Sequence, residues 1–227
     1  MDKSNTQNRN QYQIIRKDAR NCFVEIKSDS FPIGKIHLEF ATYDANRPAG
    51  QRQTNHINVY IDVAEFLSLG HFILHGSCHA RMAALKQKDS AEMNTPLYQS
   101  LGGTSAARLA SSGRARKDGK SLSRNVRLFA GKKADYLLCA ECGPGEEDAK
   151  GLIVPKYGNS PEQKVSVSLS CGHLNEIMLI TKAHYEAWLT AQLYRDYQPP
   201  QFSYGKDNGT SNVGESGNTS ADDTQMF

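Results

Sequence analysis

Three short segments in the first half of the chain alternate apolar and polar residues with a period of two. They cover residues 22–27, 34–40 and 56–63, and each places aliphatic or aromatic side chains on one side only. This spacing is typical of half-buried β-strands. We therefore predict a sheet with one apolar face and one polar face.

The period then changes to that of a helix. Apolar residues recur at helical spacing from Val63 to Leu85, and Asp62 followed by Glu65 resembles a capping box. We predict one helix from Val63 to about Lys86. Gly70 and Gly76 each weaken it by up to ~1 kcal/mol relative to alanine.

The second half follows the same order. Strand-like runs cover residues 122–128, 134–142, 151–155 and 165–169, and a helical pattern follows from 174 to about 194. We expect a hairpin turn at 131–133 and an acidic turn beginning at 143–145. The fold class predicted is α+β, with two pseudo-repeats of antiparallel strands, each followed by one long helix that packs on one face of its sheet.

These patterns divide the chain into five parts. We expect a disordered leader (1–13), a first strand-helix repeat (14–88), a basic Gly- and Ser-rich connector (89–119), a second repeat (120–197) and a disordered tail (198–227). The length fits one large domain or two small coupled ones.

Composition limits the class of protein. No apolar run approaches the ~20 residues that span a bilayer, and the polar first ten residues lack the apolar core of a secretory signal. The five scattered cysteines do not suggest a disulfide framework. We therefore predict a cytoplasmic protein without a membrane partner.

Charge is concentrated in one segment. Residues 101–133 contain nine basic side chains and one acidic one, Asp118, which gives nine minus one, or +8. Arginine and lysine are the main phosphate-binding side chains. The predicted nucleic-acid contacts are Arg108, Arg114, Arg116, Lys117, Lys120, Arg124, Arg127, Lys132 and Lys133.

Aromatic side chains supply the second element of such a surface, because every base can stack on a ring. Those that we expect to take part are Tyr136, Tyr157, Tyr60 and Tyr43. Together with the basic residues they predict a single-stranded DNA-binding protein with little sequence preference, no catalytic activity and no cofactor. RNA remains an alternative ligand.

The tail has its own pattern. A stretch rich in Gly, Asn, Ser and Thr ends in two aspartates and two apolar residues, and it carries one basic residue against four acidic ones from residue 198 onward. A terminal carboxylate, aspartates and a ring fit a basic pocket beside an apolar one. The expected partner-binding residues are Asp222, Asp223, Met226 and Phe227.

This end resembles the C-terminal tails of bacterial single-strand DNA-binding proteins. The resemblance implies recruitment of replication, repair or conjugation proteins. The order of strands and helices resembles the Whirly proteins and the related positive-cofactor-four-type fold, which implies single-stranded DNA binding and, for the latter, a homo-oligomer. Segments 102–108 and 143–151 are similar to stretches in uncharacterised proteins of bacterial conjugative elements, which implies a role in mobile-DNA processing.

Two other functions remain open. Carboxylates near Glu146 or Asp135 could support metal-dependent DNA nicking, and the basic segment could serve a duplex-binding accessory or transcription factor of a mobile element. A zinc site is a further possibility, left open by the sequence, and its ligands would be Cys139, Cys142, Cys171 and His173.

Overall fold

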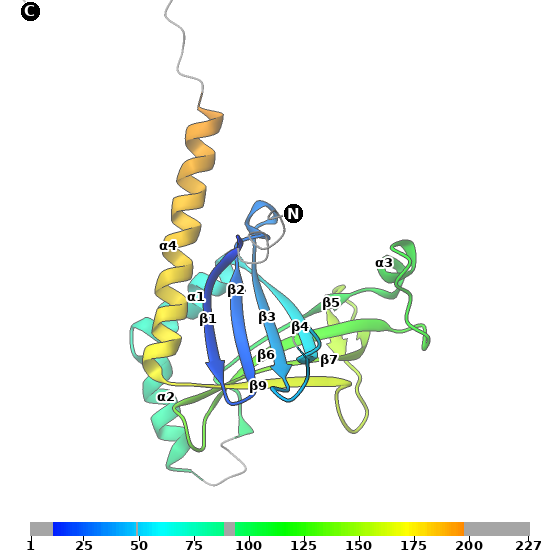
Figure 1. Cartoon of the computed structure of the whole chain (residues 1–227), viewed down its shortest axis with the longest axis horizontal. Coiled ribbons are helices and arrows are strands. Elements are labelled where there is room, and N and C mark those ends of the chain that lie inside the picture. The colour runs from blue at the N-terminus through cyan, green and yellow to red at the C-terminus, as the bar shows by residue number, and fades with distance from the viewer. Residues whose placement is uncertain (1–10, 49, 89–93, 198–227) are drawn as a thin grey trace, which may run out of the picture.

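A computed structural model describes residues 11–48, 50–88 and 94–197 of the 227-residue chain. Its first sheet contains four antiparallel strands in sequence order (Figure 1). They are β1 (Gln13–Ala19), β2 (Cys22–Lys27), β3 (Lys35–Tyr43) and β4 (Gln53–Asp62). A short 3-10 turn, η1 (Phe31–Ile33), joins β2 to β3. The period-two pattern therefore predicted β2, β3 and β4 correctly, and β1 extends the sheet into a segment that was assigned partly to the leader.

The helical segment after β4 is two helices, where the sequence predicted one. These are α1 (Val63–Leu74) and α2 (Ser77–Lys86). The break falls at Gly76, which has φ of 81° in the left-handed region that L side chains rarely adopt. The predicted capping box is absent, because Asp62 makes no side-chain cap and instead forms an ion pair with Lys35.

The second sheet contains five strands. They are β5 (Tyr98–Thr104), β6 (Ser121–Ala130), β7 (Tyr136–Glu147), β8 (Ile153–Pro155) and β9 (Gln163–Leu169). The order is β5-β6-β7-β8, and β9 also pairs with β7, always antiparallel. The expected connector at 89–119 differs from the structure, because it includes β5 and the short helix α3 (Ala106–Ser111).

The acidic turn expected at 143–148 is also displaced. Residues 143–145 lie inside β7, and the turn forms at 148–152, where Asp148 N donates to Leu152 O at 2.9 Å. β8 folds back against this part of β7. A Cβ on Gly145 would approach Ile153 Cγ2 to 2.8 Å, so glycine here permits close packing of β8 and does not mark a turn.

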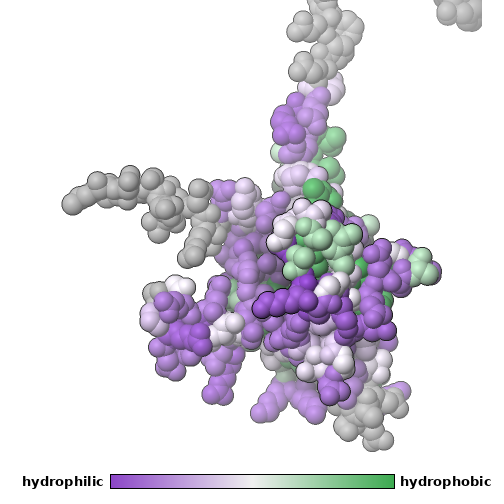
Figure 2. Space-filling view, turned by 90° about the vertical axis from the view of Figure 1, so that its right-hand side faces the viewer, coloured by the Kyte–Doolittle hydropathy of each residue, from purple (hydrophilic) through white to green (hydrophobic). Residues whose placement is uncertain are grey.

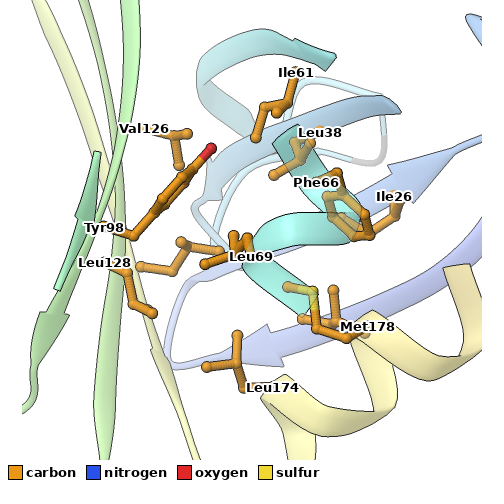
Figure 3. Close-up of a pocket in the computed structure, with 12 residues that line it drawn as sticks. Ile26, Leu38, Ile61, Phe66, Leu69, Tyr98, Val126, Leu128, Leu174 and Met178 are labelled. Atoms are coloured by element: carbon orange, nitrogen blue, oxygen red, sulfur yellow. The ribbon is translucent and has the colours of Figure 1, made fainter. Parts of the chain in front are cut away.

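The apolar faces of the two sheets share one core. β9 crosses the strands of the first sheet, and α1 and α4 (Cys171–Asp196) close one side of the core (Figure 1). At its centre is a cavity of about 20 Å³ lined by side chains from both sheets and both helices (Figure 3). It has room for about one water molecule, so it is a packing defect of the core and no ligand site.

Helix α4 packs on this core from Leu174 to Trp188. Leu174, Ile177 and Met178 are buried, and further along Phe31 makes edge-to-face contacts with Tyr185 and Trp188, with ring centroids 5.2 and 5.8 Å apart. Beyond Trp188 the helix extends away from the sheets (Figure 1). Among the described helices, none combines the length and apolarity required to cross a membrane.

Candidate nucleic-acid interface

Residues 105–120 leave the second sheet after β5 and return to it at β6, and we call them the basic arm. The Ser105 hydroxyl accepts a hydrogen bond from Arg108 N at 3.3 Å and thereby starts α3. Leu109 is the one buried residue of α3 and anchors it to the sheet. Ala106 N donates to Ser121 Oγ at 3.0 Å, which ties the start of the arm to its end.

Arg116 clamps the arm to the rest of the second sheet. Its guanidinium binds Asp118 at 2.8 Å and Glu162 at 2.6 Å. The hydrogen bonds from Arg116 lower the pKa of Glu162, and they lower the pKa of Asp118 to about 2. Arg116 was expected to contact phosphate. In the structure its guanidinium is already paired with two carboxylates, so Arg116 joins the arm to the loop before β9 and is not available to phosphate.

The remaining cations of the arm form no ion pair with a carboxylate within the described residues. They are Arg108, Arg114, Lys117 and Lys120, and all four are exposed. Of these four, Arg114 alone has a side-chain hydrogen-bond partner in the described part of the chain, the Ser112 hydroxyl at 3.3 Å. The arm therefore presents a dense, uncompensated positive charge on a segment that is fixed at both ends.

Strand β6 carries two further arginines. Arg127 lies on the outer face, forms an ion pair with the buried Glu141 and extends over the Phe129 ring, 5.4 Å from its centroid. Arg124 Nη1 donates to Thr104 Oγ1 at 3.1 Å. Arg127 is thus partly neutralised, while Arg124 keeps its charge uncompensated within the described parts of the chain.

Tyr60 comes close to Arg124, although the two residues belong to different sheets. The Tyr60 side chain is 47% exposed and stacks on His37 with centroids 4.6 Å apart. Burial and the nearby Asp29 raise the pKa of Tyr60, whereas Arg124 and Lys27 are near enough for their charges to act in the opposite direction. The structure therefore places an exposed ring beside an unpaired cation where the edge of β4 meets β6.

A row of polar side chains faces outward from β6, as the alternation of residues 122–128 indicated. Asn125 is 2% exposed, and its Nδ2 donates to the Tyr157 hydroxyl at 2.9 Å. Asn125 Oδ1 and Arg127 Nε are buried and have no hydrogen-bond partner among the described residues. Tyr157, expected to stack on bases, is instead half-buried with its ring against Gly143. The alternation Ser123-Asn125-Arg127 was the available signal for this outward-facing row.

Tyr136 cannot take part in base stacking. The residue is 1% exposed and belongs to the shared core, so the expectation for it was wrong. Burial raises its pKa. The reason lies in the alternation of β7, where Tyr136, Leu138 and Ala140 all face inward.

Lys132 and Lys133 lie in the predicted hairpin turn between β6 and β7, at the end of β6 that is remote from the arm. The ten residues of β6 span about 33 Å. Both lysines are exposed. They therefore form a separate basic site at the opposite end of the same strand.

Tyr43 lies apart from the basic residues. It ends β3, near Arg16 on the outer face of the first sheet. This face has five acidic residues against three basic ones, which gives three minus five, or −2, with histidines neutral; they are Asp18, Glu25, Asp29, Glu39, Asp62, Arg16, Lys27 and Lys35. Tyr43 is six residues along β3 from His37, on which Tyr60 stacks, so it lies about 20 Å from that ring and we exclude it from the interface.

The residues of the alternative zinc and nicking sites do not come together in the described parts of the chain. Cys139 and Cys142 are three residues apart on β7 and therefore face opposite sides of the sheet, and no group of three or more potential metal ligands occurs among the described residues. Asp135 accepts a hydrogen bond from Cys171 N, whereas Glu146 pairs with Lys156 near the other end of β7. These two carboxylates cannot share a metal ion.

The expected partner-binding residues Asp222, Asp223, Met226 and Phe227 lie outside the described residues. No protein-family model matches the chain, and searches among curated proteins and among solved structures give no significant match either. Function is therefore inferred from the geometry of the chain itself.

Proposed function

We propose that the chain binds nucleic acid, preferentially single-stranded, through the basic arm and the adjoining end of β6. The observation that carries this proposal is the set of four exposed arm cations without carboxylate partners: Arg108, Arg114, Lys117 and Lys120. Elsewhere in the described residues many cations are paired, as in Lys17–Glu176 and Lys35–Asp62. Unpaired cations on a fixed segment bind phosphates without first breaking internal ion pairs.

The preference for single strands rests on Tyr60, which offers an exposed ring beside Arg124. Phe129 does not contribute at this site, because it lies at the end of β6 remote from the arm and Arg127 covers its ring. Base stacking on an exposed ring contributes about 1–3 kcal/mol per base and is open to a strand whose bases are unpaired. A duplex would offer the same phosphates but no free bases.

Three finer expectations from the sequence belong to this proposal. The two sheets, each followed by helices, would be related units of a Whirly-like architecture, and the acidic tip would recruit replication, repair or conjugation proteins in the cytoplasm. The tip would also compete with nucleic acid for the arm, because both are anionic.

The test is a salt series of fluorescence anisotropy with a labelled single-stranded oligomer and duplex competitor. The variant carries Arg108→Gln, Arg114→Gln, Lys117→Gln and Lys120→Gln. A control with the same charge change carries Arg20→Gln, Arg52→Gln, Arg81→Gln and Arg195→Gln, which are exposed and lie on other elements than the arm and β6.

We expect the arm variant to reduce the slope of log affinity against log salt by about 0.7 for each phosphate that the arm no longer neutralises. The control should keep most of the slope. If the two variants weaken binding equally, the arm is no specific interface. If the intact chain fails to bind at low salt, the whole proposal is wrong, and preferential competition by duplex would favour the duplex-binding alternative.

A further inference from the structure

Helix α4 has a second apolar face, opposite the face that enters the core. The core face contains Leu174, Met178, Tyr185 and Trp188. On the other side, Tyr194 is 78% exposed, and Ile180 and Tyr197 are also exposed large apolar residues. Figure 2 shows such hydrophobic residues, in green, on the part of α4 that rises above the molecule.

The residues of this second face follow a heptad spacing. They are Ile180, Ala183, Ala187, Thr190, Tyr194 and Tyr197, at intervals of three, four, three, four and three residues. We call this set the α4 seam. It extends over about 27 Å when its flanking Leu179 is included. A heptad stripe of this kind is the sequence pattern of a helix that packs against another helix.

Nothing within the described parts of the chain covers the seam, because all of its residues are exposed. Beyond Trp188 the helix also has little support from the body of the molecule (Figure 1). A short helix without packing partners is only marginally stable in water, and packing of its apolar face normally supplies the missing stability. The seam therefore requires an occupant.

We infer that the occupant is the α4 seam of a second copy, packed antiparallel. In an antiparallel pair centred between Ala187 and Thr190, residues whose numbers sum to 377 meet. Ile180 then faces Tyr197, Ala183 faces Tyr194, and Ala187 faces Thr190. Each tyrosine is set against a smaller residue, and the small Ala187–Thr190 layers at the centre let the two helices approach closely, as close packing requires.

The parallel arrangement fits less well. Tyr194 and Tyr197 would each meet their own copies at one end, while Ala183 and Ala187 would meet theirs at the other. Crowding at one end and voids at the other both destabilise an interface. Charge does not oppose the antiparallel pair, because Arg195 and Asp196 lie on the other side of the helix and Glu186 is already paired with Lys182.

The body of the molecule leaves room for this pairing. It packs against the opposite side of α4, along Leu174 to Trp188. In the antiparallel pair, the body of each copy lies alongside the part of the other helix beyond Trp188 and on the side away from the seam, so the two bodies remain apart. This inference is independent of nucleic-acid binding.

The test measures the oligomeric state of the full chain by sedimentation velocity and by light scattering after size exclusion. We expect a dimer. Ala183→Tyr crowds the layer and Tyr194→Ala empties it, so each alone should raise the dimer dissociation constant about tenfold or more. The double variant restores one tyrosine and one alanine per layer and should recover much of the affinity. Gln192→Ala, on the core side, is the control.

The relative orientation of the two helices is measured by mixing differently tagged Ala183→Cys and Tyr194→Cys chains under mild oxidation. The wild-type chain measures the cross-linking that the native cysteines give. The antiparallel pair predicts a mixed disulfide, and the parallel pair predicts Ala183→Cys homodimers. A chain that stays monomeric at its highest soluble concentration would overturn the inference. So would a monomer whose seam is protected from hydrogen exchange, since residues 198–227 would then be the occupant.

Discussion

Glu25 on β2 and Glu39 on β3 lie directly opposite each other on the outer face of the first sheet, and both are buried. Their partners differ. Lys27 bonds directly to Glu39 but lies 3.8 Å from Glu25, and His56 Nε2 is 2.9 Å from Glu39 Oε1. Burial raises the pKa of Glu25, whereas for Glu39 the hydrogen bonds from Lys27 and His56 outweigh burial and lower the pKa.

The two glutamates should therefore affect stability in opposite directions. The raised pKa of Glu25 favours folding below its unfolded pKa of about 4.3, and this benefit is lost as the pH rises through the folded value. The lowered pKa of Glu39 favours folding above the unfolded pKa, and the benefit is lost as the pH falls through the folded value. At pH 7 we expect Glu25→Gln to maintain or raise the free energy of unfolding, and Glu39→Gln to lower it by about 1–3 kcal/mol.

Urea unfolding at neutral and acidic pH measures both effects. The difference between the wild type and each variant should shrink at acidic pH, where the carboxylates are protonated and resemble the amide. A Glu25→Gln variant that is less stable at pH 7 than Glu39→Gln would contradict this account of the pair.

Two adjacent glycines of β5 should respond differently to alanine. A Cβ on Gly103 would fall against the Leu122 carbonyl oxygen and 2.9 Å from Ile153 Cγ2, while a Cβ on Gly102 meets nothing closer than Arg124 O at 3.7 Å. We expect Gly103→Ala to destabilise the chain by about 1–3 kcal/mol through overpacking. Gly102→Ala, the matched control, should be close to neutral in the same thermal unfolding measurement. Equal effects would mean that β8 does not pack tightly on this end of the sheet.

Substitution of Phe31 should test whether α4 packs against the first sheet through Tyr185 and Trp188. It is buried and contacts Tyr185 and Trp188, the single tryptophan of the chain. We expect Phe31→Ala to shift Trp188 emission to longer wavelength and to cost about 3–5 kcal/mol of unfolding free energy. Ile33, in the same turn, is exposed, so Ile33→Ala should change neither property. Unchanged emission in Phe31→Ala would mean that Trp188 does not pack against Phe31.

Local pattern predicted much of this fold, and its failures have physical causes. The alternating segments became β2, β3 and β4, because one face of each packs on the core. β5 was missed because its inward positions between Tyr98 and Thr104 are Ser100 and Gly102, which carry no apolar signal. The break at Gly76 depends on a backbone conformation that helical periodicity does not reveal.

The candidate site was predicted less completely. The net charge of a segment does not show which of its cations form ion pairs with carboxylates elsewhere in the fold. Arg116 and Lys117 are neighbours and look equivalent in sequence, yet only Arg116 meets Glu162, which lies 46 residues away. Tyr136 and Tyr60 likewise differ only in the face of the strand that each occupies. Tertiary contacts, and not residue type, decide which cations and rings are free.

The clamp at Arg116 gives a prediction that rests on the proposed function. Glu162→Gln removes one negative charge beside the arm and leaves Arg116 with Asp118 as its sole carboxylate partner among the described residues. Phosphate can then compete for the guanidinium more easily. We expect tighter binding of a single-stranded oligomer and a salt dependence steeper by up to about 0.7, the increment for one additional contact to a single strand.

Glu176→Gln provides the matched control. Glu176 is an exposed carboxylate on α4, paired with Lys17 and outside the arm, so its loss makes the same change in net charge. If the two variants bind the oligomer with the same affinity and salt slope, only net charge matters and Arg116 is no latent contact. If Glu162→Gln alone binds more tightly, the ion pair between the arm and the loop before β9 sets how much of the arm's charge is available to a ligand. That result would make Glu162 the residue that limits affinity, since it competes with phosphate for the one arm cation that the fold has already neutralised.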